Sequence, residues 1–169
     1  MANYITEVLK EINDDVSLFN TTYRKIGDGG PLGVLFRHAF TAEGKFLLPD
    51  GTPPFKPDAA PIGMSPARFI GEIKKFNIFC RRDLTSMKRE TIFIQLLESI
   101  HPQEAAILIA VKDQTLTKLY PNITRQVLAG AGFIPQLTAE ELKEEEVVVK
   151  PSARPRGRPR KSDRPLLVQ

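Results

Sequence analysis

Residues 85–111, TSMKRETIFIQLLESIHPQEAAILIAV, decide the fold. Thr85–Ser86 precedes apolar residues at three- and four-residue spacing, which predicts a helix beginning there. His101–Pro102 breaks this helix and opens the next one, where Glu104 suits the positive N-terminus. The apolar run Ala105–Val111 has no polar interruption, so the second helix is predicted at the centre of a bundle.

Helical spacing recurs on both sides of this stretch. Residues 4–12 predict an amphipathic helix, and Pro31 is placed to begin another. Ser65–Pro66 predicts a helix start, with the hydroxyl as N-cap and the proline at the first position. A last helix is expected from about Pro121 to Ala129. Because no alternating strand pattern is present, the sequence predicts an all-α fold, a compact helical bundle.

A long connection separates the helices between residues 44 and 66. Its six prolines rule out a continuous helix. Apolar residues such as Phe46 and Phe55 are interleaved with them, which indicates a loop packed on the body.

The charge is distributed in three parts. Residues 1–139 carry 16 Lys+Arg and 14 Asp+Glu, residues 140–146 carry five Glu and one Lys, and residues 150–165 carry seven Lys+Arg and one Asp. We therefore expect a helical domain at 1–136, an acidic linker at 137–149 and a basic tail at 150–169. The tail is rich in proline and charge and has little to bury, so we expect it to be disordered alone.

The composition also limits the setting of the protein. A single cysteine, Cys80, excludes an internal disulfide and thiolate metal clusters. The N-terminus lacks the basic and apolar regions of a signal peptide, and no run approaches the ~18 apolar residues of a membrane span. We expect a soluble, intracellular protein, in the host cytoplasm if it is phage-encoded.

The tail contains a short basic motif between residues 154 and 161. Its sequence resembles the AT-hook of chromatin-associated proteins, and Arg156-Gly157-Arg158-Pro159 matches the core of that motif without departure. The resemblance implies binding to the minor groove of A·T-rich duplex DNA. The expected tail contacts are Arg154, Pro155, Arg156, Gly157, Arg158, Pro159, Arg160 and Lys161.

Each residue type has a physical role in such a motif. Narrow A·T-rich minor grooves concentrate guanidinium groups, and Gly157 lets the backbone lie close to the groove floor. Arg156 and Arg158 can then reach adenine N3 and thymine O2, where a guanine amino group would obstruct them. The prolines hold the chain extended, which lowers the entropy lost on binding. The alternative is a basic solubility tail, or a nuclear-import peptide in a eukaryotic host.

A second group of basic residues surrounds the helix predicted from Ser65. Arg68, Lys75 and Arg82 are seven apart and would share a face if the helix persists that far. Such a face could meet neighbouring phosphates. The alternative is a solvated helix face, with Glu72, Asp83 and Glu90 as local partners. The candidate contacts in the body are Arg68, Lys74, Lys75, Arg81, Arg82, Lys88 and Arg89.

Two family resemblances bear on the body. The helix order, Ile62-Gly63-Met64-Ser65 opening a helix, and Ala106–Lys118 followed by Leu119-Tyr120-Pro121 resemble the N-terminal DNA-binding domain of tailed-phage ATP-dependent DNA ligases. This resemblance spans about residues 4–135 and implies a fold and duplex binding only. The whole chain resembles a family of small proteins of unassigned function common in T-even-type phages and their cyanobacterial relatives.

The sequence departs from the ligases where their chemistry would lie. Ligases adenylate a lysine in Lys-x-Asp-Gly, whereas Lys25-Ile26-Gly27-Asp28-Gly29 has two residues between lysine and aspartate. We expect no ligase catalytic domain after the helical body. His38, His101 and Cys80 show no metal-ligand spacing, and Cys80 falls on an apolar stripe. We expect no enzymatic activity, no catalytic residue, no cofactor and no metal.

The sequence thus favours a non-enzymatic protein that binds A·T-rich double-stranded DNA. The tail would bind the minor groove, and the body would contact the DNA backbone or a phage or host replication, transcription or packaging protein. The rival is a protein-interaction module, such as a virion or polymerase-associated factor, with a non-specific basic tail. No membrane partner is expected.

Overall fold

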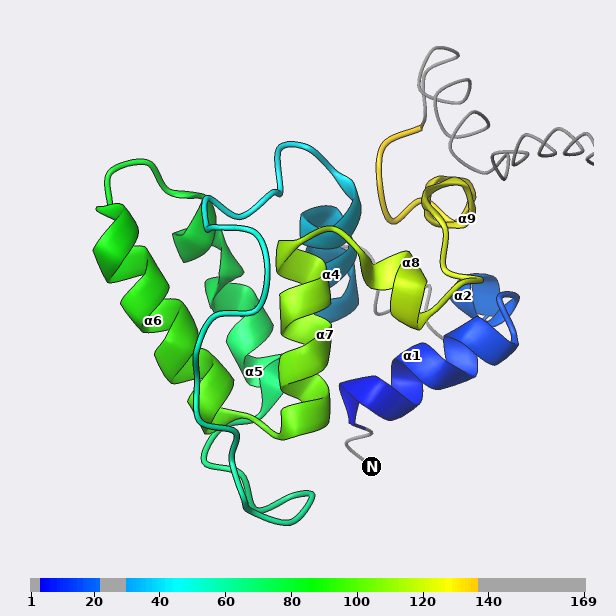
Figure 1. Cartoon of the computed structure of the whole chain (residues 1–169). Helices are drawn as coiled ribbons and strands as arrows, with labels where there is room; N and C mark the ends of the chain where they lie inside the picture. Colours follow the sequence, from blue (N-terminus) through cyan, green and yellow to red (C-terminus); the bar gives the residue numbers. More distant parts are fainter. Residues whose placement is uncertain (1–3, 22–29, 137–169) are drawn as a thin grey trace, which may run out of the picture. The chain divides into compact units, whose positions relative to one another are not determined.

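Helix α7 (Pro102–Lys112) occupies the centre of the fold (Figure 1). The computed structural model describes residues 4–21 and 30–136, which belong to one compact unit. Within it α7 buries residues on several sides, which confirms the predicted central helix. The helices that contact α7 are α1 (Ile5–Asp14), α4 (Pro31–Phe40), α6 (Ser86–Ser99) and α8 (Leu116–Leu119).

The described residues form helices and no strand, which confirms the all-α prediction. None of these helices is long and apolar enough to span a membrane. The predicted acidic linker (137–149) and basic tail (150–169) lie outside the described residues, as does the Lys25–Gly29 segment.

The N-terminal helix is joined to the last turns of the bundle. As predicted, α1 is amphipathic and buries Ile5, Val8, Leu9 and Ile12. Beyond it, a short helix, α2 (Leu18–Thr21), follows. At the end of α1, the Asn122 side-chain amide donates to the Asn13 carbonyl at 2.7 Å, and the Asn122 N–H donates to Asn13 Oδ1 at 3.0 Å.

The chain between α7 and Gln136 contains two short helices. The sequence predicted one helix from about Pro121, but the chain forms α8 and then α9 (Arg125–Gly130). Helix α9 starts at Thr124, whose hydroxyl accepts from the Val127 N–H at 3.3 Å. The start moves because Thr124 supplies the N-cap, while the side chain of Asn122, another residue type that can cap, donates to the Asn13 carbonyl.

Helix α4 begins at Pro31 as predicted and ends against a tightly packed glycine. A Cβ at Gly44 would lie 2.4 Å from the Arg37 carbonyl oxygen and 2.8 Å from His38 Cα, so this position accepts glycine only. Gln114, at φ 53°, donates its side-chain amide to the Thr41 carbonyl at 2.7 Å. These contacts satisfy the carbonyl end of α4 and turn the chain sharply into the long connection.

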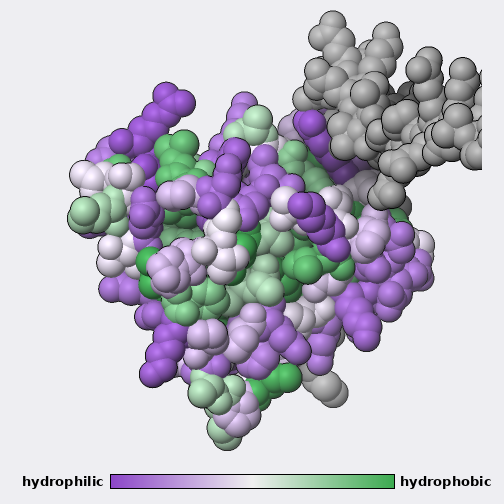
Figure 2. Space-filling view, in the orientation of Figure 1, coloured by the Kyte–Doolittle hydropathy of each residue, from purple (hydrophilic) through white to green (hydrophobic). Residues whose placement is uncertain are grey.

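The connection from Thr41 to Arg68 contains no helix and runs over the body, as expected. Phe46 is buried. Further along, buried Lys112 donates to the Pro49 carbonyl at 2.7 Å and pairs with Asp113. The Gly51 N–H donates to the Asp113 carboxylate at 3.3 Å, which completes a clamp between the connection and the end of α7. The part of the connection that precedes α5 projects at the bottom of Figure 1, and Figure 2 shows hydrophobic atoms there.

The predicted helix start at Ser65–Pro66 is wrong. Helix α5 (Phe69–Glu72) begins after Arg68 and continues as a 3₁₀ segment, η1 (Ile73–Cys80). The Ala67 N–H is already engaged by the Ser99 carbonyl at 2.9 Å, at the far end of α6. This tertiary hydrogen bond uses an N–H that the Ser65 hydroxyl would otherwise cap, and that hydroxyl has no hydrogen-bond partner among the described residues.

An aromatic cluster forms much of the core between α4, η1 and α6. The rings of Phe46, Phe69, Phe76, Phe79 and Phe93 pack in edge-on and tilted pairs, with centroids 5.0–6.4 Å apart. A second group joins Phe19, Phe36 and Phe133. These contacts hold α5–η1 against α6, the two elements that carry the predicted basic surface.

Candidate nucleic-acid interface

The predicted tail contacts, Arg154, Pro155, Arg156, Gly157, Arg158, Pro159, Arg160 and Lys161, lie outside the described residues. The structure bears only on the body, where the seven predicted cations lie on α5, η1, the loop after it and the first turns of α6. They fall into three groups by their contacts.

Four of the seven cations are exposed and belong to no ion pair among residues 4–21 and 30–136. Arg68 is the N-cap of α5, and Lys74 lies in η1. Arg82 follows η1, and Lys88 is in the first turn of α6. Arg68 therefore lies at one end of the α5–η1 segment, and Arg82 and Lys88 lie at the other. The fold does not gather the four into one patch.

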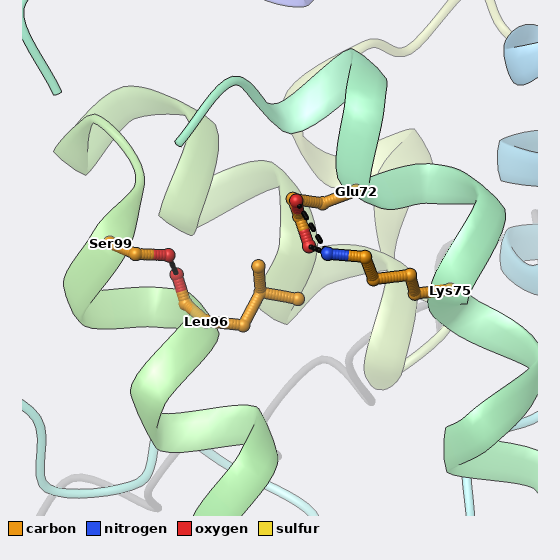
Figure 3. A network of polar contacts seen from close by, with 4 residues as sticks. All are labelled: Glu72, Lys75, Leu96 and Ser99. Carbon is orange, nitrogen blue, oxygen red and sulfur yellow. Dashed lines mark hydrogen bonds and ion pairs between the residues drawn. The ribbon is translucent and has the colours of Figure 1, made fainter. Parts of the chain in front are cut away.

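Two further cations already have acidic partners, as the solvated-face alternative predicted. The Lys75 ammonium lies 2.8 Å from the Glu72 carboxylate (Figure 3). Arg81 pairs with Asp83, and this hydrogen bond lowers the pKa of Asp83 and raises that of Arg81. Lys75, Arg81 and Asp83 are exposed and Glu72 is half-buried. Because their charges are already paired, Lys75 and Arg81 offer less unpaired charge to a polyanion than the four cations above.

The seventh cation, Arg89, is buried. It is 7% exposed, and its guanidinium donates to the Arg81 carbonyl, which ties the end of η1 to α6. We therefore remove Arg89 from the set of candidate DNA contacts and assign it a structural role. A signal was present in the sequence: Arg89 lies one turn before Phe93, on the stripe that continues to Leu96 and is buried.

The proposed alignment of Arg68, Lys75 and Arg82 on one helical face is also wrong. The α-helical geometry ends at Glu72, and η1 has 3.0 residues per turn, so positions seven apart no longer share a face. Arg82 lies beyond the last residue of η1, Cys80.

The start of α6 combines positive charge with a positive helix end. The Thr85 hydroxyl accepts from the Lys88 N–H at 3.4 Å, and the first turn contains no acidic residue. A lysine at this position interacts unfavourably with the helix dipole, typically by about 0.3–1 kcal/mol. With Arg82 on the preceding loop, the backbone N–H groups and two free cations leave this end of α6 electropositive.

A buried polar cluster that the sequence spacing did not reveal lies between α4 and η1. His38 Nδ1 donates to the Gly44 carbonyl at 2.8 Å, and Cys80 Sγ lies 3.6 Å from that nitrogen. Burial lowers the pKa of His38 and raises the pKa of the Cys80 thiol. Both groups are thus held neutral, which suits a structural role and opposes nucleophilic chemistry. The part of the chain that the structure describes contains no group of three or more His, Cys, Asp or Glu residues able to hold a metal.

The chain matches the model of a family of unknown function (DUF6433) over residues 13–118. It belongs to this family. No curated protein and no solved structure matches the chain. The DUF6433 match includes all the body cations, from Arg68 to Arg89, and the basic motif at 154–161 lies beyond it.

The buried histidine gives this DUF6433 protein a predicted pH dependence. Burial lowers the pKa of His38 below 6.5 in the folded chain. As the pH falls through about 6.5, the histidine is therefore protonated in the unfolded chain while it stays neutral in the folded one. We expect the free energy of unfolding to fall between pH 7.5 and 6. NMR titration of the His38 ring and urea unfolding at both pH values would measure this. A ring that titrates at or above pH 6.5 would contradict the prediction. Burial raises the pKa of Glu104, so protonation of this carboxyl increases the free energy of unfolding at lower pH, the opposite of the His38 effect.

Proposed function

We propose that this protein binds A·T-rich double-stranded DNA without acting on it chemically. The tail binds the minor groove, and the helical body contacts the DNA backbone or a replication, transcription or packaging partner. The site of action is inside the cell, in the host cytoplasm if the protein is phage-encoded.

The observation that carries the proposal is the uninterrupted core Arg156-Gly157-Arg158-Pro159. Two arginines flanking a glycine suit a narrow groove of negative potential, and the flanking cations Arg154 and Arg160 suit phosphates. One such motif binds weakly, so contacts from the body are needed to raise the affinity.

The body supports the proposal through its unpaired cations. Arg82 and Lys88 lie at the electropositive end of α6, where a phosphate would also meet backbone N–H groups. A lysine that interacts unfavourably with its own helix is a local conflict of the kind expected at functional positions. The likeness of residues 4–135 to the DNA-binding domain of phage ligases agrees with duplex binding, and it remains a proposal.

The hook arginines provide the test. In a fluorescence titration at ~150 mM salt, we expect the full chain to prefer an A·T-rich duplex over a G·C-rich one by about tenfold. Arg156→Ala with Arg158→Ala should abolish this preference, as should ending the chain at Val149. The matched control is Arg154→Ala with Arg160→Ala, which should weaken binding to both duplexes equally because these residues are assigned to phosphates.

Equal binding of the full chain to both duplexes would overturn the minor-groove assignment. The tail would then only supplement charge. Co-purification of the nuclease-treated full chain with a defined protein partner would favour the interaction-module alternative.

A further inference from the structure

An apolar turn projects from the connection that precedes α5. Ile62 is 58% exposed and Met64 is 75% exposed, although both are large hydrophobic residues. The Met64 N–H donates to the Pro61 carbonyl at 3.0 Å, and Gly63 between them has φ +93°. This is the pattern of a type II β-turn, with glycine at the position that requires positive φ.

The turn is held in place on both sides of its tip. Before it, the Lys56 N–H donates to the Glu98 carboxylate at 3.1 Å, and after it the Ala67 N–H donates to the Ser99 carbonyl at 2.9 Å. The backbone at Gly63 lies against Tyr4, since a Cβ there would be 2.6 Å from the Tyr4 hydroxyl oxygen. The two apolar side chains are thus presented to solvent by an ordered segment, which Figures 1 and 2 show at the bottom of the molecule.

We infer that Ile62 and Met64 form a wedge that inserts between base pairs in the minor groove of bound duplex DNA. This inference rests on the proposed function. Minor-groove proteins insert isoleucine, methionine and similar apolar side chains at a base step, and the duplex bends by about 20–90°. Insertion between the bases would remove the exposed apolar surface of Ile62 and Met64 from water, which the fold itself does not do.

The surroundings of the turn favour DNA as the occupant. Arg68, four residues after Met64, is exposed and has no ion-pair partner in the described residues, so it can meet a phosphate beside the inserted step. The hook core is proposed for the same groove. The 20 residues from 137 to 156 could reach at most about 66 Å, which is enough for both elements to occupy one short duplex.

The test uses the full chain and an A·T-rich duplex labelled at both ends, with 2-aminopurine at its central steps. Anisotropy reports binding, end-to-end energy transfer reports bending, and 2-aminopurine fluorescence reports unstacking. We expect the chain to raise the last two signals. Ile62→Ser with Met64→Ser should abolish both while lowering affinity by less than about tenfold, because the phosphate contacts remain. Met87→Ser is the matched control, since Met87 is 78% exposed at the start of α6 and away from the turn.

The outcomes separate the wedge from the proposed function. Binding without bending or unstacking, or signals that persist in the double variant, would overturn the wedge and leave duplex binding intact. No binding to the A·T-rich duplex would overturn the proposed function and the wedge with it. Binding of the full chain to phosphatidylserine vesicles that the double variant loses, without any change on DNA, would reassign the turn to a lipid surface. The melting temperatures of both variants should match the unmodified chain, because all three side chains are exposed.

Discussion

Asp113→Asn is expected to lower the free energy of unfolding by about 1–3 kcal/mol, because it removes the charged partner of the buried Lys112 ammonium. Lys112 is 2% exposed, and its ammonium contacts only the Asp113 carboxylate and the Pro49 carbonyl among the hydrogen bonds of the described residues. The substitution keeps the size of the side chain and removes its charge, which leaves the buried ammonium uncompensated. Urea unfolding followed by circular dichroism would measure the change.

A second variant identifies the cause of that loss. Lys112→Met combined with Asp113→Asn removes the buried charge itself, so we expect it to recover most of the stability. If the single variant stays within about 0.5 kcal/mol of the unmodified chain, water already screens the Lys112 ammonium. The clamp between the long connection and α7 would then depend on the neutral hydrogen bonds alone.

Reversing the charge of Arg82 and Lys88, the two unpaired cations at the start of α6, is expected to weaken duplex binding by roughly 10- to 100-fold at ~150 mM salt. Arg82→Glu with Lys88→Glu removes two proposed phosphate contacts, so the salt dependence of the affinity should decrease by about two in slope. The matched control is Lys10→Glu with Lys118→Glu, which changes the net charge equally on α1 and α8. Figure 1 shows these helices on the other side of α7 from α6.

Lys88→Glu alone separates binding from folding. It places a carboxylate in the first turn of α6, three residues after the Thr85 N-cap, where a capping box can form. We expect the free energy of unfolding to rise by about 0.3–1 kcal/mol while DNA affinity falls.

Equal losses of affinity in the α6 double variant and in the α1–α8 control would show that only net charge matters and that the body has no defined DNA-binding surface.

Helix starts could be predicted where local chemistry decides them. Pro31, Thr85 and His101–Pro102 each combine a cap or an N-terminal proline with an apolar stripe, and each opens a helix in the structure. Ser65–Pro66 carries the same local signal but opens no helix, and the Ser99 carbonyl accepts from the Ala67 N–H that the Ser65 hydroxyl would have capped. That partner is 32 residues away in the sequence, and helical periodicity contains no information about it.

The candidate surface shows the same limit. Composition identifies a basic segment, but it does not tell an exposed cation from a buried one that joins two helices. Lys88 and Arg89 are neighbours, yet one is exposed and the other donates to the Arg81 carbonyl. Likewise the contact between His38 and Cys80 joins residues 42 apart, and only the packing of α4 on η1 brings them together.

The change of winding at Ile73 has a consequence for the length of this segment. Four α-helical and eight 3₁₀ residues extend about 22 Å, whereas twelve α-helical residues would extend about 18 Å. The neighbouring α6 has 14 residues and extends about 21 Å. Ala67 is bonded to Ser99 at the end of α6, and Arg81 is bonded to the side chain of Arg89 near its start, so the segment runs alongside most of this helix. The 3₁₀ winding lengthens the segment by about 4 Å, so its twelve residues extend about as far as the 14 residues of α6.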